Sequence, residues 1–457
     1  MNIRKLSAAL LLFSGFPALL MAQSQPLTLK QCLQQALSNN QNIAISRYEE
    51  QNGEQQIIQT RSRSLPQVNA TGNLSDNFKK QVIVIPAGVF PGAGGSDGKP
   101  TTLVAGTTYT TAISADVSQP LFDAAAFTGL KAATAGREYY KLSTKQTEEE
   151  VISQVSQAYY RILANREQIK VQDTNIVRLT RLVNATQGQY NNGLARKIDL
   201  DRIKVSLTNA QTQRTQAMNQ IAIQTNQLKV LMGVSVESNI TPADLSIRDI
   251  EERVTQYVPE DNFDLQKRTE ILVLNTQVRL GQLQKKATQA ENYPKLSAFF
   301  NYSQNAQSNT FSNLFAGGGD QVNYGIGAFG LRLNIPIFDG FSRRSRAAQN
   351  QIQINEIEKR REATALNLTA GFQNSRIQMA NSISSIQAQR QNVQLAENVY
   401  SASQANYNLG LATLTDLLDA QNSFITAQNS YTQALLDYKL AEIESIRSAG
   451  NIRSLLQ

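Results

Sequence analysis

The sequence predicts an α+β fold built from two similar halves, each with a long antiparallel helical hairpin and a pair of β-strands. The first observation is a repeat: residues 190–194 (YNNGL) return as residues 407–411 (YNLGL), an offset of 407 − 190 = 217. Residues 120–123 (PLFD) return as residues 336–339 (PIFD), an offset of 216. Solenoid units recur every 20 to 50 residues, so this longer repeat indicates a duplicated half-protein.

The second observation is a change of hydrophobic period in each half. From Ile152 to Tyr190, mostly apolar seam positions recur with alternating spacings of three and four, and the same spacing returns from Phe372 to Tyr407. Towards Tyr190 the seam positions are Asp173, Ile176, Thr180, Val183 and Gln187. This is the pattern of a coiled-coil seam, and it predicts two long helices in matching register. Residues 67–78 and 107–118 instead alternate apolar and small polar side chains, as half-buried strands do.

The helical pattern divides the rest of the chain into segments. Residues 23–65 predict two N-terminal helices, about 27–40 and 42–64. Residues 121–233 predict the first long hairpin, with its tip near 190–202, and residues 337–450 predict the second, with its tip near 407–420. The remaining expectations are a linker at 234–262 with a short helix near 243–256, a helix at 263–293 and a tail at 451–457.

Each half also predicts one β-hairpin, at residues 66–120 and 294–336. Glycine and proline gather in the loops 79–106 and 307–323, which we expect to be surface connections. One short side and one side with long loops is typical of outer-membrane strands. The apolar positions change parity between Tyr324 and Leu331, which predicts a bulge near Gly327–Gly330. At the other ends we expect four prolines to stop the ladders and lead into helices, because proline has no N–H to donate; they are Pro66, Pro120, Pro294 and Pro336.

Composition narrows the class of protein. Of 457 residues, 41% are hydrophobic and none is tryptophan, which favours thin elongated bundles over a thick core. The formal charge of +8 is spread along the chain without a dense basic block, so we expect a solvated basic surface and no nucleic-acid partner.

The N-terminus reads as an export signal. Residues 1–22 combine the basic Arg4 and Lys5, an apolar stretch and a small-residue exit. We find no other run of 18 apolar residues, so we expect no transmembrane helix in the mature chain. The single cysteine, Cys32, falls on the apolar face of a helical pattern, and we expect it to fill a core rather than to carry a lipid anchor.

Enzyme chemistry has little support. The chain has no histidine, which removes histidine-based triads and zinc sites, and one cysteine cannot form a thiolate cluster. Residues 92–99 resemble a phosphate-binding loop, but the glycine spacing is one residue too long and Pro100 replaces the required Ser or Thr. We therefore expect no catalytic residue, no cofactor and no metal centre.

A sheet of four strands leaves the backbone N–H and C=O groups of its two outer strands without partners. An open sheet has two unpaired edges, and unsatisfied N–H and C=O groups in a bilayer cost several kcal/mol each. A closed membrane barrel needs about eight strands or more. Either the strands pack on a soluble core, or several chains pool them into one barrel.

The hairpin tips carry acidic residues shortly after each Gly-Leu turn. Asp199 and Asp201 follow Gly193-Leu194, and Asp416 and Asp419 follow Gly410-Leu411. A spacing of three places Asp416 and Asp419 on one helix face. They could cap the helix N-terminus or form an acidic, pore-facing pair, and the sequence leaves both open.

Taken together, the duplicated halves, the strand pairs, the heptad hairpins and the Gly-Leu turns followed by Asp-x-x-Asp resemble the TolC-type outer membrane factor family. The resemblance covers essentially the whole mature chain and is strongest over residues 407–420. It implies a homotrimer in the outer membrane with a large periplasmic portion, in which four strands from each chain form a twelve-stranded barrel and the helices form a tunnel. It also implies a periplasmic adaptor protein, an inner-membrane pump of RND, ABC or MFS type, and outer-membrane lipid as partners.

The resemblance also assigns roles to residues. It implies that Asp416 and Asp419 line the periplasmic aperture and that Asp199 helps to hold it shut. Gly193-Leu194 and Gly410-Leu411 would be the tips that dock the adaptor. One departure is Ala412, which stands where the best-known member has an arginine that bonds the first hairpin; Arg196, Lys197 or Arg202 would then have to supply that pairing.

The expected function is therefore a passive channel-tunnel that exports small molecules such as drugs, toxic compounds or metals within a tripartite efflux system. The same outer component would serve type I protein secretion, which is the first alternative. A periplasmic structural or adaptor coiled-coil protein without a pore is the second.

Overall fold

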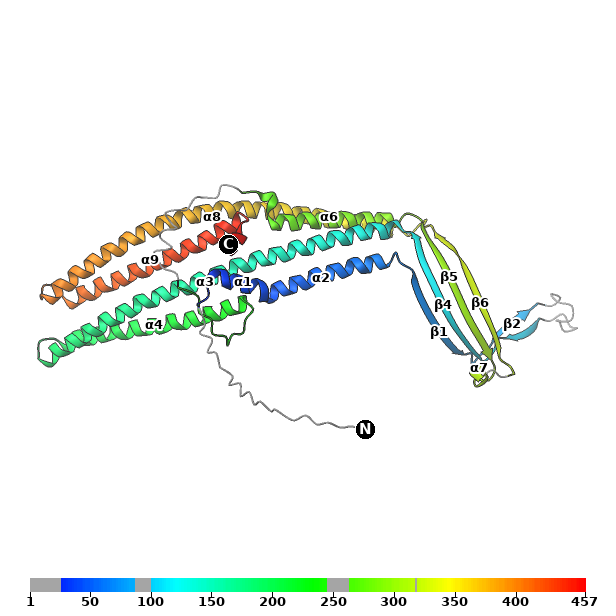
Figure 1. Cartoon of the computed structure of the whole chain (residues 1–457), viewed down its shortest axis with the longest axis horizontal. Coiled ribbons are helices and arrows are strands. Elements are labelled where there is room, and N and C mark those ends of the chain that lie inside the picture. Colours follow the sequence, from blue (N-terminus) through cyan, green and yellow to red (C-terminus); the bar gives the residue numbers. More distant parts are fainter. Residues whose placement is uncertain (1–25, 87–99, 245–262, 317–318) are drawn as a thin grey trace, which may run out of the picture.

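The computed structural model of the chain describes residues 26–86, 100–244, 263–316 and 319–457. Two long helical hairpins lie side by side along one axis, and a β-sheet stands at a steep angle at one end (Figure 1). The export signal expected at residues 1–22 lies outside the described residues, and so does nearly all of the short helix expected near 243–256.

The two halves build hairpins of matching length. In the first half α3 (Ala124–Asn191) has 68 residues and α4 (Lys197–Leu231) has 35. In the second half α8 (Ser342–Asn408) has 67 residues and α9 (Leu414–Ser448) has 35. At 1.5 Å per residue the longer helices extend about 100 Å. These lengths confirm the predicted duplication of the helical hairpin.

Shorter helices complete the half of the rod that leads to the sheet. They are α1 (Leu29–Asn39), α2 (Gln41–Ser62) and α6 (Thr269–Ala290), with 3₁₀ turns at Leu265–Lys267 and Ile452–Leu456. α2 runs beside α3, and α6 runs beside α3 and α8 (Figure 1). The N-terminal helices predicted from the sequence are thus present, with ends shifted by one or two residues.

The main hydrophobic core lies in the middle of the rod, where α1 packs on α3 and where the ends of α4 and α9 add side chains to the same buried cluster. Cys32, Leu33, Val155 and Ile443 are all at most 1% exposed there. Cys32 therefore fills the core, as predicted. Burial raises the pKa of its thiol to about 11, because the thiolate would lose its hydration.

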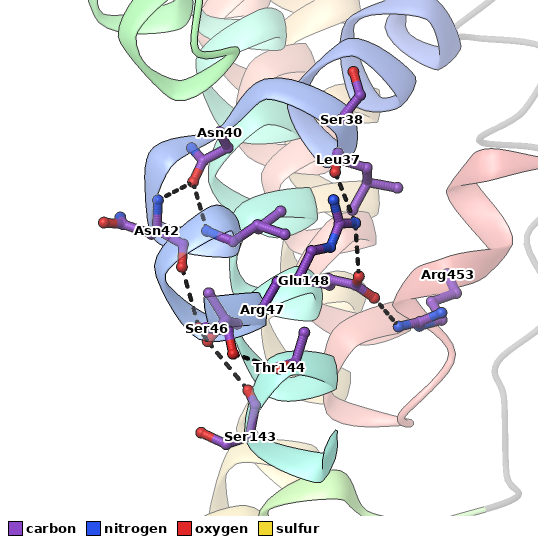
Figure 2. A network of polar contacts seen from close by, with 12 residues as sticks. Leu37, Ser38, Asn40, Asn42, Ser46, Arg47, Ser143, Thr144, Glu148 and Arg453 are labelled. Atoms are coloured by element: carbon purple, nitrogen blue, oxygen red, sulfur yellow. Dashed lines mark hydrogen bonds and ion pairs between the residues drawn. The ribbon is translucent and has the colours of Figure 1, made fainter. Parts of the chain in front are cut away.

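Polar contacts beside this core hold the N-terminal helices, α3 and the C-terminal residues together (Figure 2). Glu148 on α3 binds Arg47 of α2 at 3.3 Å and also binds Arg453 near the C-terminus. Arg47 donates to the Leu37 carbonyl oxygen at 3.0 Å, and the Asn40 side chain caps α2 by accepting from the backbone N–H of Asn42 at 2.9 Å. These contacts join the N-terminal helices, α3 and the C-terminus at one level of the rod.

In the half of α3 that leads to the tip, the most buried positions differ from the predicted seam by one residue. There the buried side chains are Gln172, Asn175, Leu179 and Thr186, each one residue before the predicted seam position. The reason is that α3 faces two helices there. Gln172 bonds Gln213 of α4 at 3.1 Å, and Asn175 bonds Gln421 of α9 at 2.5 Å, so these polar pairs take the most buried positions. Ile176 and Val183 of the predicted seam are partly buried and pack against the cluster that contains Leu179.

The main sheet has four antiparallel strands in the order β1-β4-β5-β6. Their bounds are β1 (Gln67–Asp76), β4 (Tyr109–Phe122), β5 (Lys295–Ser308) and β6 (Val322–Asn334). The strands from the two halves pair through β4 and β5. β1 and β6 therefore form the two edges of the sheet.

The predicted bulge near Gly327–Gly330 is wrong. β6 pairs with β5 in unbroken register from Val322 to Asn334. The parity change instead places apolar side chains on both faces of β6. Glycine makes this possible, because a Cβ at Gly330 would stand 3.1 Å from the Phe299 ring and a Cβ at Gly325 would stand 2.8 Å from the Tyr302 hydroxyl.

The loops hold more structure than the sequence suggested. The segment 79–106 contains a second hairpin, β2 (Gln81–Ile85) with β3 (Thr101–Ala105), and the segment 307–323 contains α7 (Asn313–Ala316). Only surface connections were expected there. The glycine and proline residues near these short elements indicate turns, so the sequence pattern did not predict them.

The four prolines do not act alike. Pro66 and Pro294 stand directly before β1 and β5, as expected. Pro120 lies inside β4, which continues to Phe122 through a register shift, so the expectation that Pro120 ends the ladder is wrong. Pro336 stands two residues beyond the end of β6, and α8 starts only at Ser342.

Candidate functional site

The turns at the free ends of the hairpins have the same backbone. Gly193 and Gly410 adopt φ of 75° and 76°, the left-handed region that a residue with a side chain enters only at a cost. The N–H of Leu194 donates to the Gln189 carbonyl at 2.8 Å, and the N–H of Leu411 donates to the Asn406 carbonyl at 2.8 Å. These bonds satisfy carbonyl groups at the helix C-termini.

The leucines in these turns point away from the protein. Leu194 is 80% exposed and Leu411 is 75% exposed. In such turns the residue after the glycine usually packs back on its own helix. Two exposed leucines on rigid turns therefore offer apolar contacts to another molecule.

Beyond the tips, the return helices start differently in the two halves. Thr413 and Asp416 form a reciprocal cap on α9: the Thr413 hydroxyl accepts from the Asp416 N–H at 3.2 Å, and an Asp416 carboxylate oxygen accepts from the Thr413 N–H at 3.0 Å. The Thr413 hydroxyl and N–H lower the pKa of Asp416, because they stabilise its charged form. In the first half Arg196 replaces Thr413 and binds Asp199 at 2.9 Å.

The other predicted aspartates have no such role. Asp201 and Asp419 are both exposed on their helices. Asp419 lies one turn after Asp416, while Leu417 and Ala420 turn inward between and after them. Within the described residues, the Asp419 side chain has no hydrogen bond or ion pair to the chain. α9 thus presents two carboxylates at one exposed edge, one engaged in a cap and one free.

Among the described residues, three polar or cation–π contacts add to the apolar clusters around Leu179 and Leu417 and hold the two hairpins together in the tip region of one chain. Arg202 donates to the Thr415 hydroxyl at 3.1 Å, and Gln421 donates to the Asn175 side chain at 2.5 Å. Of the basic residues considered from the sequence, Arg202 makes the contact across the hairpins, whereas Arg196 pairs within its own hairpin.

The third contact was not foreseen. The Arg178 guanidinium of α3 lies 5.3 Å from the ring centre of Tyr400 on α8 and 5.2 Å from that of Phe424 on α9. The two rings stack at 5.8 Å with a 9° angle between their planes. The position that matches Arg178 in the second half is 178 + 217 = 395, where the chain has an exposed leucine. A comparison of the two halves at that offset would therefore have singled out Arg178 as a difference between them.

The sheet at the other end has one apolar face and one face that is mainly polar on β1, β4 and β5, to which β6 adds Tyr324 and Ile326. Cross-strand register places Val68, Val117, Phe300 and Phe329 in one row on the apolar face. The adjacent row on the opposite face is Asn69, Asp116, Asn301 and Ala328. The apolar row is open to the surroundings, with Phe329 87% exposed. β1 and β6 each have one edge that no described strand of the chain pairs.

The junctions between sheet and rod are fixed by aspartates. Asp123 caps α3 by accepting from the Ala125 N–H at 2.9 Å, and it binds Lys295 beside Pro294 at 3.1 Å. Asp339 accepts from the N–H of Arg343 at 2.9 Å in the first turn of α8. The Pro-x-Phe-Asp repeat is thus explained by its final aspartate, which binds the first turn of the following helix.

No described helix has the length and hydropathy to cross a membrane. Among the described residues, no three side chains of His, Cys, Asp or Glu gather in a way that could hold a metal ion.

Comparison with known proteins places this geometry in a family. The family model described as outer membrane efflux protein matches residues 32–234 and 264–451. The toluene efflux pump outer membrane protein TtgC of Pseudomonas putida is 24% identical over 302 residues, which is 66% of this chain and 60% of TtgC. The outer membrane protein TolC of Escherichia coli is 22% identical over 346 residues, which is 74% of this chain and 69% of TolC. The match thus spans less than two thirds of TtgC.

Solved structures share the fold over nearly the whole chain. The Campylobacter jejuni CmeC outer membrane channel matches with a TM-score of 0.72 at 13% identity, covering 93% of this chain and 85% of CmeC. The outer membrane protein VceC of Vibrio cholerae matches with a TM-score of 0.69 at 15% identity, covering 92% of this chain and 96% of VceC. The predicted fold class is confirmed, and the chain belongs to the outer membrane efflux protein family, with the outer membrane as its location.

Proposed function

We propose that three copies of this chain form an outer-membrane channel whose helices continue as a tunnel into the periplasm. The sheet carries the proposal, because it has two unpaired edges, an exposed apolar face and a polar face. Pairing β1 of one chain with β6 of the next satisfies both edges. Three chains of four strands give 3 × 4 = 12 strands, enough for a closed barrel with lipid outside and water inside.

In this proposal the channel is passive and completes a tripartite efflux system for small molecules. The exposed Leu194 and Leu411 at the tips receive a periplasmic adaptor protein, which links the channel to an inner-membrane pump of RND, ABC or MFS type. The printed names of relatives support efflux as the role, since TtgC is a toluene efflux pump component.

The tips also act as the gate. The three contacts between the hairpins, Arg202 to Thr415, Asn175 to Gln421, and Arg178 to its two rings, hold the closed arrangement. Adaptor contact at the tips shifts the population toward an open arrangement, which requires that the adaptor bind the open form more tightly. Three copies of Asp416 and Asp419 then surround the aperture and favour cations.

Protein secretion is a second candidate. The alkaline protease secretion protein AprF of Pseudomonas aeruginosa is 21% identical over 333 residues, covering 71% of this chain. A strain lacking the gene distinguishes the two: small-molecule efflux predicts increased susceptibility to toxic compounds, whereas secretion predicts loss of a protein from the culture medium.

The test of the channel is physical. Detergent extracts of the outer membrane should contain a species of about three chains that dissociates on heating, and planar bilayers containing it should show single-channel conductance. A monomer that fractionates without detergent and forms no pore would overturn the proposal and favour a periplasmic structural or adaptor protein.

A further inference from the structure

A phenylalanine lies among the polar side chains of the sheet at the end nearest the rod. Phe299 on β5 pairs with Ser118 of β4 and Gly330 of β6, so its side chain lies on the same face as Asn301 and Ser303. On β1, β4 and β5 this face has small polar side chains at most other positions, which makes a partly exposed phenylalanine conspicuous there. The proposed assembly turns this face toward water, so membrane burial does not explain the ring.

The neighbouring strand accommodates that ring. A Cβ at Gly330 would stand 3.1 Å and 3.2 Å from two atoms of the Phe299 ring, so the ring lies across a position with no side chain. Two residues further along β6, the Arg332 guanidinium lies 5.1 Å from the centre of the same ring. This is cation–π distance, and it holds the cation beside the aromatic surface.

Arg332 keeps its hydrogen-bonding capacity. Its side chain is exposed, and it makes no hydrogen bond or ion pair with any part of the chain that the structure describes. Its planar guanidinium offers five N–H donors in a fork that matches a carboxylate. Other cations near this end are occupied, as Lys295 is by Asp123 and Arg343 by Asp339.

The polar face also separates its charges along the strands. Asp116 lies in the row of Asn301, and Arg332 lies in the row of Ser297, four residues away. At 3.3 Å per residue this is about 13 Å, too far for an ion pair and beyond one Debye length at physiological salt. Arg332 thus acts as an independent positive site.

We propose that Phe299 and Arg332 form a weak binding site for aromatic carboxylates on the lumen face of each chain. The guanidinium binds the carboxylate, and the ring of the solute packs against the edge of Phe299 that Arg332 leaves open. Three copies would place three such sites at one level of the barrel, near its periplasmic end. This inference rests on the proposed trimeric channel, because only that assembly makes this face a lumen.

The absence of tryptophan from the sequence allows a direct test. Phe299→Trp places a single fluorescent reporter at the site. In the purified, detergent-solubilised protein, quenching by iodide is compared with quenching by neutral acrylamide. We expect the iodide-to-acrylamide ratio to fall about twofold when Arg332→Gln is added, because a nearby cation in water attracts the anionic quencher only weakly and leaves the neutral quencher unaffected. The matched control is Arg344→Gln, which removes an exposed arginine outside the sheet.

Competition then identifies the class of ligand. Benzoate should protect the reporter from iodide more effectively than cyclohexanecarboxylate of the same charge. An unchanged quenching ratio after Arg332→Gln, or equal protection by the two acids, would overturn the site. Size measurement on the same samples separates the two proposals: a monomer would refute the channel, whereas a trimer without the Arg332 effect would refute only this site.

A second measurement keeps Phe299 in place. In planar bilayers, Arg332→Gln should lower the permeability of benzoate relative to cyclohexanecarboxylate, and Arg344→Gln should not. An identical permeability ratio in the native protein and both variants would count against the site even if Phe299→Trp fails to assemble.

Discussion

Cys32 shows how a single side chain reports on the packing of the rod. It is fully buried, and burial raises the pKa of its thiol to about 11. At pH 8 the thiolate, which is the reactive form, is therefore scarce as well as inaccessible. We expect no labelling by a maleimide in the native protein and full labelling in denaturant, measured by mass spectrometry.

The control for this labelling uses a tip residue. In a Cys32→Ala background, Leu194→Cys should be labelled rapidly, because that position is 80% exposed. Rapid labelling of native Cys32 would show that the central core opens readily.

The ionised side chain of Glu149 lowers the stability of the native state, because the carboxylate is partly buried. It lies on α3, accepts from the Thr269 hydroxyl at 3.0 Å, and has Lys145 at 3.8 Å and Arg453 at 4.0 Å, with Glu270 nearby. Burial is the largest influence and raises its pKa, so the native state binds the proton more tightly than the unfolded chain. The stability contributed by the protonated form is therefore lost as pH rises from the ordinary glutamate range through the raised native pKa.

We expect Glu149→Gln to melt at a higher temperature than the native protein at pH 7 and at an equal temperature near pH 4, measured by circular dichroism. Glu138→Gln, which affects an exposed ion pair with Arg279, is the matched control and should change little. A lower melting temperature for Glu149→Gln at pH 7 would mean that the surrounding cations outweigh burial.

At the scale of elements, each of the four long helices ends at a glycine with positive φ. Gly193 and Gly410 form the tips, and Gly233 and Gly450 end the return helices, with 450 − 233 = 217. Thus the repeat sets the end as well as the length of each helix. The second pair went unnoticed in the sequence because the residues around it differ between the halves.

Two of these glycines should differ in their tolerance of a side chain. A Cβ at Gly193 would meet nothing within 4 Å, whereas a Cβ at Gly233 would stand 2.1 Å from the Asn39 carbonyl oxygen. Gly193→Ala should cost about 1–2 kcal/mol for the left-handed backbone alone. Gly233→Ala should cost about 1–3 kcal/mol more, because backbone must move. Thermal unfolding of both variants checks this, and equal costs would contradict it.

Arg178 joins three helices from both hairpins, and its removal should loosen the gate. Arg178→Leu loses a partly desolvated cation–π contact of about 1–2 kcal/mol. If only the closed form has this contact, the open population at rest should rise about tenfold, seen as more frequent openings in planar bilayers. Arg181→Leu, one turn away and exposed, is the control. Equal opening frequencies in the two variants would exclude Arg178 from gating.

At the scale of the whole molecule, the proposed role of Asp416 and Asp419 in cation selectivity depends on the proposed trimer. We expect Asp416→Ala with Asp419→Ala to reduce cation selectivity and block by divalent cations, because three copies of each carboxylate surround the aperture. Thr413→Ala separates capping from charge: it should cost about 1 kcal/mol of stability while leaving selectivity intact. Unchanged selectivity in the double variant would leave Asp416 as a helix cap and Asp419 as a solvated side chain.

The sequence predicted the fold closely because two periodicities and one repeat all constrain the same chain. The long seams required helices, the alternating segments required strands, and the 217-residue offset made each prediction in one half a check on the other. The prediction of buried positions failed where one face of a helix packs against several neighbouring helices. The buried positions of α3 moved by one residue because Gln172 and Asn175 pair with two different helices.

Some residues of the candidate site could be predicted from the sequence, and others could be found only in the structure. The Gly-Leu turns form the hairpin tips, and Asp416 caps α9, which is one of the two roles that the sequence left open for it. Turns and caps depend on residues close in the chain. Arg178 contacts the stacked rings of Tyr400 and Phe424, and Phe299 contacts Arg332 across Gly330, so each set joins residues from separate strands or helices. No local pattern links such residues, because their proximity arises from packing.

By itself, therefore, the sequence determined the duplicated hairpins, the strand pairs, the chemistry of the tips and the family that these features resemble. Only the tertiary structure decided the order β1-β4-β5-β6, the unbroken register of β6 and the contacts that join the hairpins. The physical reason is range: periodicity and capping act over a few residues, whereas register and side-chain contacts between the two halves depend on the positions of atoms more than 100 residues apart in the chain, as Arg178 and Tyr400 are.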